Sequence, residues 1–105
     1  MSATPEAKVK ARIRDWLKAR GIWYCQPIGS GYGVGGVPDL ICCWNSMLLA
    51  IEAKAPGKRS NTSAKQDAQI AAIRKSGGIA IVVDDVSQLD ELEAQLKKGD
   101  HANQT

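Results

Sequence analysis

The sequence has little of the histidine and cysteine chemistry on which many hydrolases and metal sites depend. Its single histidine is His101, close to the C-terminal end, which excludes a catalytic centre or a metal site built on histidines. The three cysteines, Cys25, Cys42 and Cys43, are an odd number without CxxC spacing, which argues against a disulfide framework and a zinc site. We expect all three to be buried as small apolar side chains in a reducing cytoplasm.

Phenylalanine and long apolar segments are also absent, so Trp16, Trp23 and Trp44 supply most of the large aromatic surface. No apolar run approaches the ~18 residues of a membrane span, and the charged N-terminal segment predicts that there is no signal peptide. What remains is the composition of one globular domain: 105 residues, 44% hydrophobic and 24% charged. The net charge of +3 permits a polyanionic partner without establishing one.

The spacing of apolar residues and turn formers predicts an α/β protein with the element order α-β-β-β-α-β-α. Thr4 and Pro5 suit the start of a first helix, which Gly21 ends. Ser87 begins a last helix, which Gly99 ends. We expect these helices to flank a mixed sheet of about four strands. The remaining segments are strands at 22–26, 38–44, 47–54 and 79–83, a middle helix that runs through 76, and a disordered tail at 100–105.

A tight turn at Asn45 and Ser46 fixes how the strands on either side of it pair. In a two-residue hairpin loop the flanking residues face each other, and every further cross-strand pair adds up to the same number. Counting outward brings Asp39 opposite Glu52, and a four-residue loop leaves this register unchanged. The two acidic side chains are then expected to have their Cβ atoms ~5 Å apart.

Two carboxylates at one cross-strand position repel each other, and burial increases the cost. A divalent cation held by Asp39, Glu52 and the carbonyl of Ala53 would compensate. Lys54 shares a sheet face with Glu52, because side chains alternate along a strand. This set suits phosphodiester hydrolysis, in which Lys54 orients or deprotonates a metal-bound water or stabilises the developing charge. A surface pair of Glu52 and Lys54 is the simpler alternative, and the register favours the metal site.

Two further polar residues lie at the inward edges of the flanking helices. Glu6 precedes Val9 by three positions, so it could complete the metal site, although an acid in the first helical turn also suits the helix dipole. Gln66 could hold the water or a phosphate, but Ser63 and Gln66 also fit a capping box. We expect that one side chain cannot fill both roles, and the spacing slightly favours the cap.

Residues 31–36 match the pattern GxGxxG, but neither a dinucleotide site nor a P-loop follows from it. A dinucleotide fingerprint opens a helix, whereas this segment opens the strand at Pro38, and no GK[ST] follows. We therefore expect no nucleotide cofactor. The loop could instead approach a DNA phosphate, or it could be a flexible connector. The candidate contacts are Ser30, Gly31, Tyr32 and Gly36.

Basic residues form two groups along the chain. The first group falls in the first twenty residues, and a solvated helix face explains it as well as a DNA contact does. The second group lies beside the proposed metal site, where we expect contacts with DNA phosphates. The first group contains Lys8, Lys10, Arg12, Arg14, Lys18 and Arg20, and the second contains Lys54, Lys58, Arg59 and Lys65.

The order of these residues resembles the PD-(D/E)xK nuclease signature. Pro-Asp at 38–39 is followed by Glu-Ala-Lys at 52–54, so that the Glu comes thirteen positions after the Asp. Glu6 near the start of the first helix, the glycine-rich approach to the Pro-Asp pair, and Gln66 on the following helix resemble one branch in particular. That branch is the virus-type replication-repair nuclease (VRR-NUC) domain, and the resemblance covers roughly 4–83.

The resemblance implies a restriction-endonuclease-like core, one nuclease domain at 1–99, and dependence on Mg²⁺ or Mn²⁺. It implies that the metal ligands are Asp39, Glu52, the Ala53 carbonyl and Glu6, and that the catalytic residues are Asp39, Glu52, Lys54, Gln66 and Glu6. Stand-alone members look like phage or bacterial proteins that dimerise and cut branched DNA such as four-way junctions. A cytoplasmic homodimer, in a bacterial cell or a phage-infected host, is therefore expected. A nickase or exonuclease with the same chemistry, or a non-cleaving DNA-binding module, is the alternative.

Overall fold

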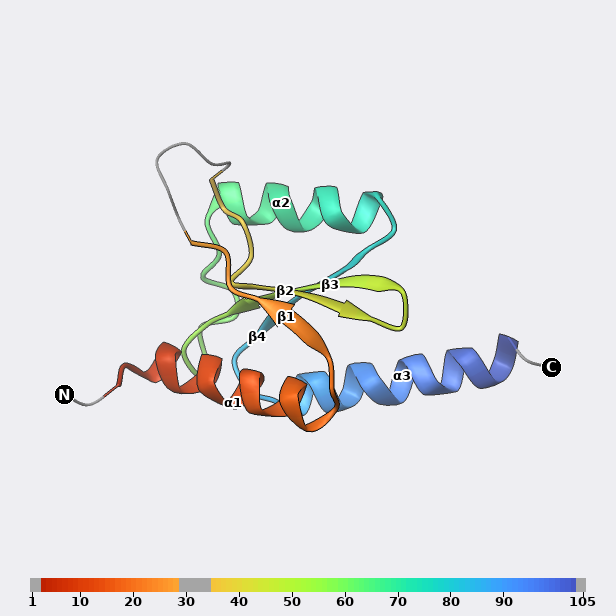
Figure 1. The fold of residues 1–105 in the computed structure, drawn as a ribbon. Helices are drawn as coiled ribbons and strands as arrows, with labels where there is room; N and C mark the ends of the chain where they lie inside the picture. Colours follow the sequence, from red (N-terminus) through yellow and green to blue (C-terminus); the bar gives the residue numbers. More distant parts are fainter. Residues whose placement is uncertain (1–2, 29–34, 104–105) are drawn as a thin grey trace.

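A computed structural model describes residues 3–28 and 35–103 of the chain and shows an α/β fold (Figure 1). A four-stranded mixed sheet and three helices follow the predicted element order. Within the described residues, no helix combines the length and the apolar character that a membrane crossing requires. The elements are α1 (Pro5–Ala19), β1 (Trp23–Cys25), β2 (Leu40–Trp44), β3 (Met47–Ala53), α2 (Ala64–Lys75), β4 (Ile79–Val83) and α3 (Ser87–Asn103).

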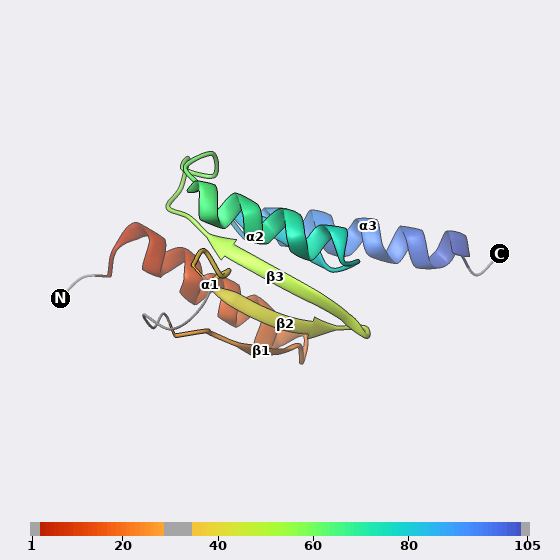
Figure 2. The same cartoon turned by 90° about the horizontal axis from the view of Figure 1, so that it is seen from above.

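The strands lie in the order β1-β2-β3-β4, with antiparallel pairing from β1 to β3 and parallel pairing between β3 and β4. Helix α2 lies on one face of the sheet, and α1 and α3 lie on the other (Figure 1). Seen from above, α2 lies over the side of the sheet that contains β3, while β1 and β2 lie beside it (Figure 2). Because β3 has a hydrophobic cluster on each side, every residue from Leu49 to Ala53 is buried. An acidic residue in this segment is therefore placed inside the protein.

Helix α1 begins and ends as the sequence predicts. The Thr4 side chain is the N-cap and accepts a hydrogen bond from the backbone N–H of Ala7 at 3.1 Å. After the helix, Gly21 adopts a φ of 66°, a conformation that glycine reaches without strain. One stripe of the helix is buried against the sheet. The N-terminal part of α1 therefore lies near the start of β2 and the end of β3. The buried residues of α1 are Val9, Ile13, Trp16 and Leu17.

The turn between β2 and β3 has the predicted geometry. Asn45 and Ser46 have φ values of 50° and 67°, as in the turns that best match the twist of a two-residue hairpin. The pairing runs from Trp44 opposite Met47 to Leu40 opposite Ile51, which confirms the predicted register.

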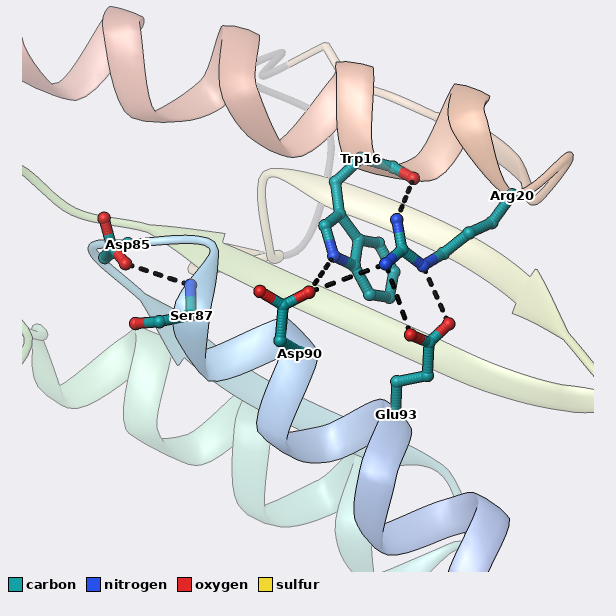
Figure 3. A network of polar contacts seen from close by, with 6 residues as sticks. All are labelled: Trp16, Arg20, Asp85, Ser87, Asp90 and Glu93. Carbon is teal, nitrogen blue, oxygen red and sulfur yellow. Dashed lines mark hydrogen bonds and ion pairs between the residues drawn. The ribbon is translucent and has the colours of Figure 1, made fainter.

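A network of polar contacts joins α1 to α3 (Figure 3). The Arg20 guanidinium contacts both carboxylate oxygens of Glu93, at 2.7 and 3.2 Å, and its Cζ lies 3.7 Å from the ring centroid of Trp16. The indole N–H of Trp16 donates to Asp90 Oδ1 at 2.8 Å. Arg20 also donates to the backbone carbonyl of Trp16 at 3.2 Å. These contacts hold α1 and α3 together through residues that are more than seventy positions apart in sequence.

Two arginines cover the outer edge of β4. The backbone N–H of Lys54 donates to the Val83 carbonyl, so the carbonyls of Ala80 and Val82 point away from β3 by strand alternation. Arg74 donates two hydrogen bonds to the Ala80 carbonyl, at 2.7 and 3.0 Å, and Arg59 donates one to the Val82 carbonyl at 3.0 Å. An edge whose carbonyls are already occupied is a poor template for an additional strand.

Two predictions about the chain were wrong. Helix α3 does not end at Gly99 but continues to Asn103, so part of the predicted disordered tail is helical. A single glycine costs a helix only ~1 kcal/mol relative to alanine, and two lysines, which are good helix formers, precede this one. Of the cysteines, Cys42 is buried, but Cys25 and Cys43 are exposed. Both lie on the sheet face that α2 covers only in part, because α2 packs over β3 and β4.

Candidate active site

The register of the hairpin brings Asp39 to the end of β3. Asp39 lies one residue before Leu40, and Glu52 lies one residue after its partner Ile51, so the two acids lie across from each other. Asp39 Oδ2 accepts a hydrogen bond from the backbone N–H of Ala53 at 2.8 Å. This bond fixes the Asp39 carboxylate beside the strand that carries Glu52.

Glu52 is the one charged or polar residue that is buried among the described residues, with 4% of its surface exposed. Its Oε1 accepts a hydrogen bond from Gln66 Nε2 at 3.2 Å, whereas its buried Oε2 has no hydrogen-bond partner. The pKa of Glu52 is raised to about 8, and burial is the largest cause. Asp39 adds to this pKa shift, because it can accept a proton from neutral Glu52 and it repels the charged form. The site therefore holds a carboxyl group whose negative charge is poorly compensated.

Gln66 is both a helix cap and a member of the site. Its Oε1 accepts from the backbone N–H of Ser63 at 2.9 Å, and its backbone N–H donates to Ser63 Oγ at 3.1 Å, which completes the capping box. The same Oε1 accepts from Lys54 Nζ at 3.0 Å, and Nε2 donates to Glu52. The expectation that one side chain cannot serve both roles was wrong, because the amide oxygen accepts two bonds while the nitrogen donates separately.

Lys54 shares the face of Glu52, as the alternation of side chains predicts. Its ammonium binds Gln66 Oε1, and its positive charge acts on Glu52 in the opposite direction from burial, lowering the pKa of that group. Lys54 and Glu52 are thus connected through the amide of Gln66. An ammonium held in this position lies beside the carboxylates without neutralising Glu52 Oε2.

The sequence reasoning missed Lys10. Its Nζ lies 3.5 Å from Asp39 Oδ1 and 3.6 Å from Glu6 Oε2, so it connects α1 to the site. Glu6 is 44% exposed, and its negative charge raises the pKa of Glu52 only as the smallest of several causes. Direct ligation of a metal by Glu6 stays a prediction. The spacing of Glu6 and Lys10, four residues apart on one helix, was the signal that could have found this pair.

The residues at the end of β3 fit a divalent cation. Glu52 Oε2 is buried and unsatisfied, and a cation would supply the positive partner it lacks. The Ala53 N–H points toward Asp39, and the carbonyl of the same residue in an antiparallel strand points to the same edge. Within 3–28 and 35–103, no three histidine, cysteine, aspartate or glutamate side chains are grouped to hold a metal alone. The fitting ligand set is thus two carboxylates and a carbonyl.

The loop residues divide into two sets. Ser30, Gly31 and Tyr32 lie outside the described residues, so their expected contact with DNA is untested. Gly36 has a φ of 81°, and a Cβ added there would lie 2.4 Å from the backbone of Lys65. Gly36 is therefore needed for close packing against the first turn of α2, a reason that the sequence reasoning did not anticipate. Its role in DNA binding stays a prediction.

The expected basic contacts precede α2 in sequence or lie in its first turn. Lys58, Arg59 and Lys65 are exposed. Arg59 also donates to the Val82 carbonyl, and the aliphatic part of Lys65 packs against Gly35. Lys58 and Lys65 keep their ammonium groups on the surface, where a phosphate could reach them.

A cavity of about 490 Å³ lies away from these groups, at the other end of α2. It is lined by Met47, Leu48 and Ile73 together with small residues of the turns, and it contains no titratable side chain. Acid–base or metal chemistry therefore has no support there, and the site at the start of α2 is the better candidate.

Comparison of the chain with protein-family models, with curated proteins and with solved structures finds no match. Only the residues of the site itself therefore indicate a function. Five of the residues expected there are brought together by the fold, and a sixth, Glu6, lies at the border of the site through Lys10. The five are Asp39, Glu52, Ala53, Lys54 and Gln66.

Proposed function

We propose that this protein is a nuclease that hydrolyses phosphodiester bonds of DNA with the help of Mg²⁺ or Mn²⁺. The observation that carries the proposal is the buried Glu52 Oε2, which accepts no hydrogen bond as a carboxylate oxygen and lies in a site with Asp39 and Lys54. A purely structural acid at this position would be expected to have a paired charge. The arrangement resembles that of PD-(D/E)xK nucleases, and in particular of VRR-NUC domains.

The residues of the chain prepare the two carboxylates for a cation. Gln66 holds Glu52 Oε1, which leaves Oε2 to bind the metal. The Ala53 N–H holds Asp39 Oδ2, which leaves Oδ1 on the other side of that carboxylate. When bound, Mg²⁺ or Mn²⁺ would polarise the phosphoryl oxygen and lower the pKa of a coordinated water. Binding would also favour the charged form of Glu52, whose pKa is otherwise raised to about 8.

Lys54 is the residue that we assign to the chemical step. Its ammonium is oriented by Gln66 Oε1, so it does not need to be ordered when the substrate arrives. A fixed positive charge at this place stabilises negative charge that develops on the phosphate, or orients the attacking water. Gln66 is a positioning residue in this scheme, because it holds both Glu52 and Lys54.

The preferred substrate is proposed from the resemblance alone. Stand-alone VRR-NUC domains suggest branched DNA such as four-way junctions, cut by a homodimer in the cytoplasm of a bacterial cell or its infecting phage. Two-fold symmetry of a junction would match a two-fold dimer with two sites. The exposed Lys58, Arg59 and Lys65 lie where they could contact the phosphates of such a substrate.

Cleavage of labelled four-way junction, flap and duplex DNA, with Mg²⁺ or Mn²⁺ and with EDTA, tests the proposal. We expect wild-type protein to cut at least one of these substrates only when a metal is added. Asp39→Ala and Lys54→Ala should each reduce the rate by about 10²–10⁴-fold, because each removes a group that acts in the transition state.

Control variants at exposed positions distinguish the effect of losing a site residue from the effect of losing a charge anywhere on the protein. Glu91 and Lys75 are exposed on α3 and α2, and Glu91→Gln and Lys75→Ala should cut at the wild-type rate. Circular dichroism of every variant checks that the fold is kept. No cleavage by wild type with either metal would favour a DNA-binding module, and full activity of Lys54→Ala would refute the assigned site.

A further inference from the structure

Lys10 lies in the candidate site but belongs to none of the motifs that identified it. Its Nζ contacts Asp39 Oδ1 at 3.5 Å and Glu6 Oε2 at 3.6 Å. Its side chain is 28% exposed, whereas the side chains of Lys8 and Lys18 on the same helix are exposed. Helix α1 therefore holds one of its ammonium groups against a carboxylate that we propose as a metal ligand.

The two oxygens of Asp39 have different partners. Oδ2 accepts a hydrogen bond from the Ala53 N–H, which ties it to the end of β3. Oδ1 is the oxygen that lies next to the Lys10 ammonium. Oδ1 has no backbone N–H as a partner, so it is the Asp39 oxygen that is freer to bind a cation. The oxygen available to the metal is thus the one that Lys10 covers.

A divalent cation and an ammonium group that share one carboxylate oxygen repel each other strongly. The repulsion is larger in a partly buried site than in water, because the effective dielectric constant is lower. Lys10 has a second partner within reach, since Glu6 lies one helical turn earlier. Its ammonium can therefore leave Asp39 and remain paired with a carboxylate.

We propose that Lys10 is an internal counter-ion that covers Asp39 Oδ1 in the metal-free protein and shifts to Glu6 when a divalent cation binds. This inference rests on the proposed function, because it requires a cation at Asp39. Lys10 is a positioning residue in this scheme: it holds Asp39 in place before the metal arrives, and it lowers the affinity for the metal. Glu6 serves as the receiving partner of the ammonium.

Binding of Mn²⁺ to the full chain, measured by electron paramagnetic resonance or calorimetry, tests this role without any DNA. Lys10→Gln should bind Mn²⁺ about tenfold more tightly than wild type, because the competing charge is removed. Lys8→Gln causes the same change in net charge on the same helix and should stay within about twofold of wild type. Lys10→Arg keeps the charge and should restore the weaker binding. Equal affinities of Lys10→Gln and Lys8→Gln would overturn the inference.

A double-mutant cycle tests the part assigned to Glu6. Glu6→Gln should weaken Mn²⁺ binding in the wild-type background, because Lys10 loses its second partner. In the Lys10→Gln background, the same substitution should have no further effect. Equal weakening in both backgrounds would identify Glu6 as a direct ligand and overturn its role as the receiving partner.

Asp39→Ala separates this inference from the proposed function. If wild type binds Mn²⁺ and Asp39→Ala does not, the metal site stands, and the Lys10 variants decide the inference alone. If no Mn²⁺ binding depends on Asp39, both proposals are overturned. The rise in melting temperature on addition of Mn²⁺ gives a second readout, which should be larger for Lys10→Gln than for Lys8→Gln.

Discussion

Two polar clusters lie on opposite faces of the sheet. They differ in whether their charged groups are paired. The network around Arg20 on the α1–α3 side pairs each of its charges: Arg20 with Glu93 and Asp90, and Asp90 with the Trp16 indole. The candidate site at the start of α2 buries Glu52 and leaves its Oε2 without a partner. Both clusters join segments distant in sequence, but only the first has its charges matched.

The pKa shifts express this difference. Hydrogen bonding to Glu93 raises the pKa of Arg20, and the same bond lowers the pKa of Glu93, so the network favours both charged forms. In the candidate site, the pKa of Glu52 is raised to about 8, mainly by burial, and the neutral form is favoured. The first cluster stabilises the fold as it is. The second is destabilised when Glu52 is charged, and a bound cation would compensate the free-energy cost of that buried charge.

The largest expected effect comes from removing the charge of Glu52. The pKa of this group is raised from 4.5 to about 8 in the folded protein, so the folded state holds a proton that the unfolded state has released. The stabilisation is full below pH 4.5 and is lost as the pH rises toward 8. Each pKa unit corresponds to about 1.4 kcal/mol, so Glu52→Gln should raise stability at pH 8.5 by roughly 4–5 kcal/mol and change it little at pH 4.5.

Urea unfolding in EDTA at these two pH values measures the effect. Glu91→Gln, which removes an exposed carboxylate from α3, is the control and should change neither value by more than about 0.5 kcal/mol. If Glu52→Gln is equally destabilising at both pH values, Glu52 is not an uncompensated acid, and the contrast between the two clusters disappears.

A smaller effect of opposite sign is expected from Arg20→Ala. This change removes the contact with Glu93 and the packing over the Trp16 ring, and it should lower stability by about 1–2 kcal/mol. Metal-dependent cleavage should stay at the wild-type rate, because the network lies between α1 and α3, on the sheet face opposite to α2 (Figure 1). Thermal unfolding, together with Arg14→Ala on the same helix as the control, measures the loss. A cleavage defect that exceeds the stability loss would show that the clusters are coupled.

The smallest effect is expected from an exposed charge outside both clusters. Lys58→Ala should leave stability unchanged and weaken DNA binding a few-fold, and the slope of log affinity against log salt should fall by about 1. Fluorescence anisotropy between 50 and 200 mM salt measures both quantities, with Lys75→Ala as the control. Identical salt slopes for Lys58→Ala and wild type would show that Lys58 does not contact DNA.

Local patterns were enough to predict the element order and the hairpin register. Thr4, the Asn45-Ser46 turn and the capping box at Ser63 each act over a few residues, so their effect is readable in the sequence. The pairing of Asp39 with Glu52 followed from the turn by counting. The last helix was predicted too short, because the cost of Gly99 in a helix is small and depends on its neighbours.

The contacts of the site depended on tertiary packing that no local pattern reveals. Lys10 looked like one of six basic residues on a helix, and only the position of α1 against the start of β2 places its ammonium at Asp39. The exposure of Cys25 and Cys43 similarly depends on how far α2 extends over the sheet. The combined role of Gln66 required knowing that its amide oxygen can reach both Ser63 and Lys54.

Because Gln66 both caps α2 and contacts the candidate site, almost no other residue could replace it. Glutamate could replace the oxygen that accepts from Ser63 and Lys54, but it would place a second acid against Glu52, where the amide nitrogen now donates. Alanine would remove both the start of α2 and the link between Glu52 and Lys54. The beginning of a helix and the candidate site thus share one amide group, so a substitution at this position would affect both together.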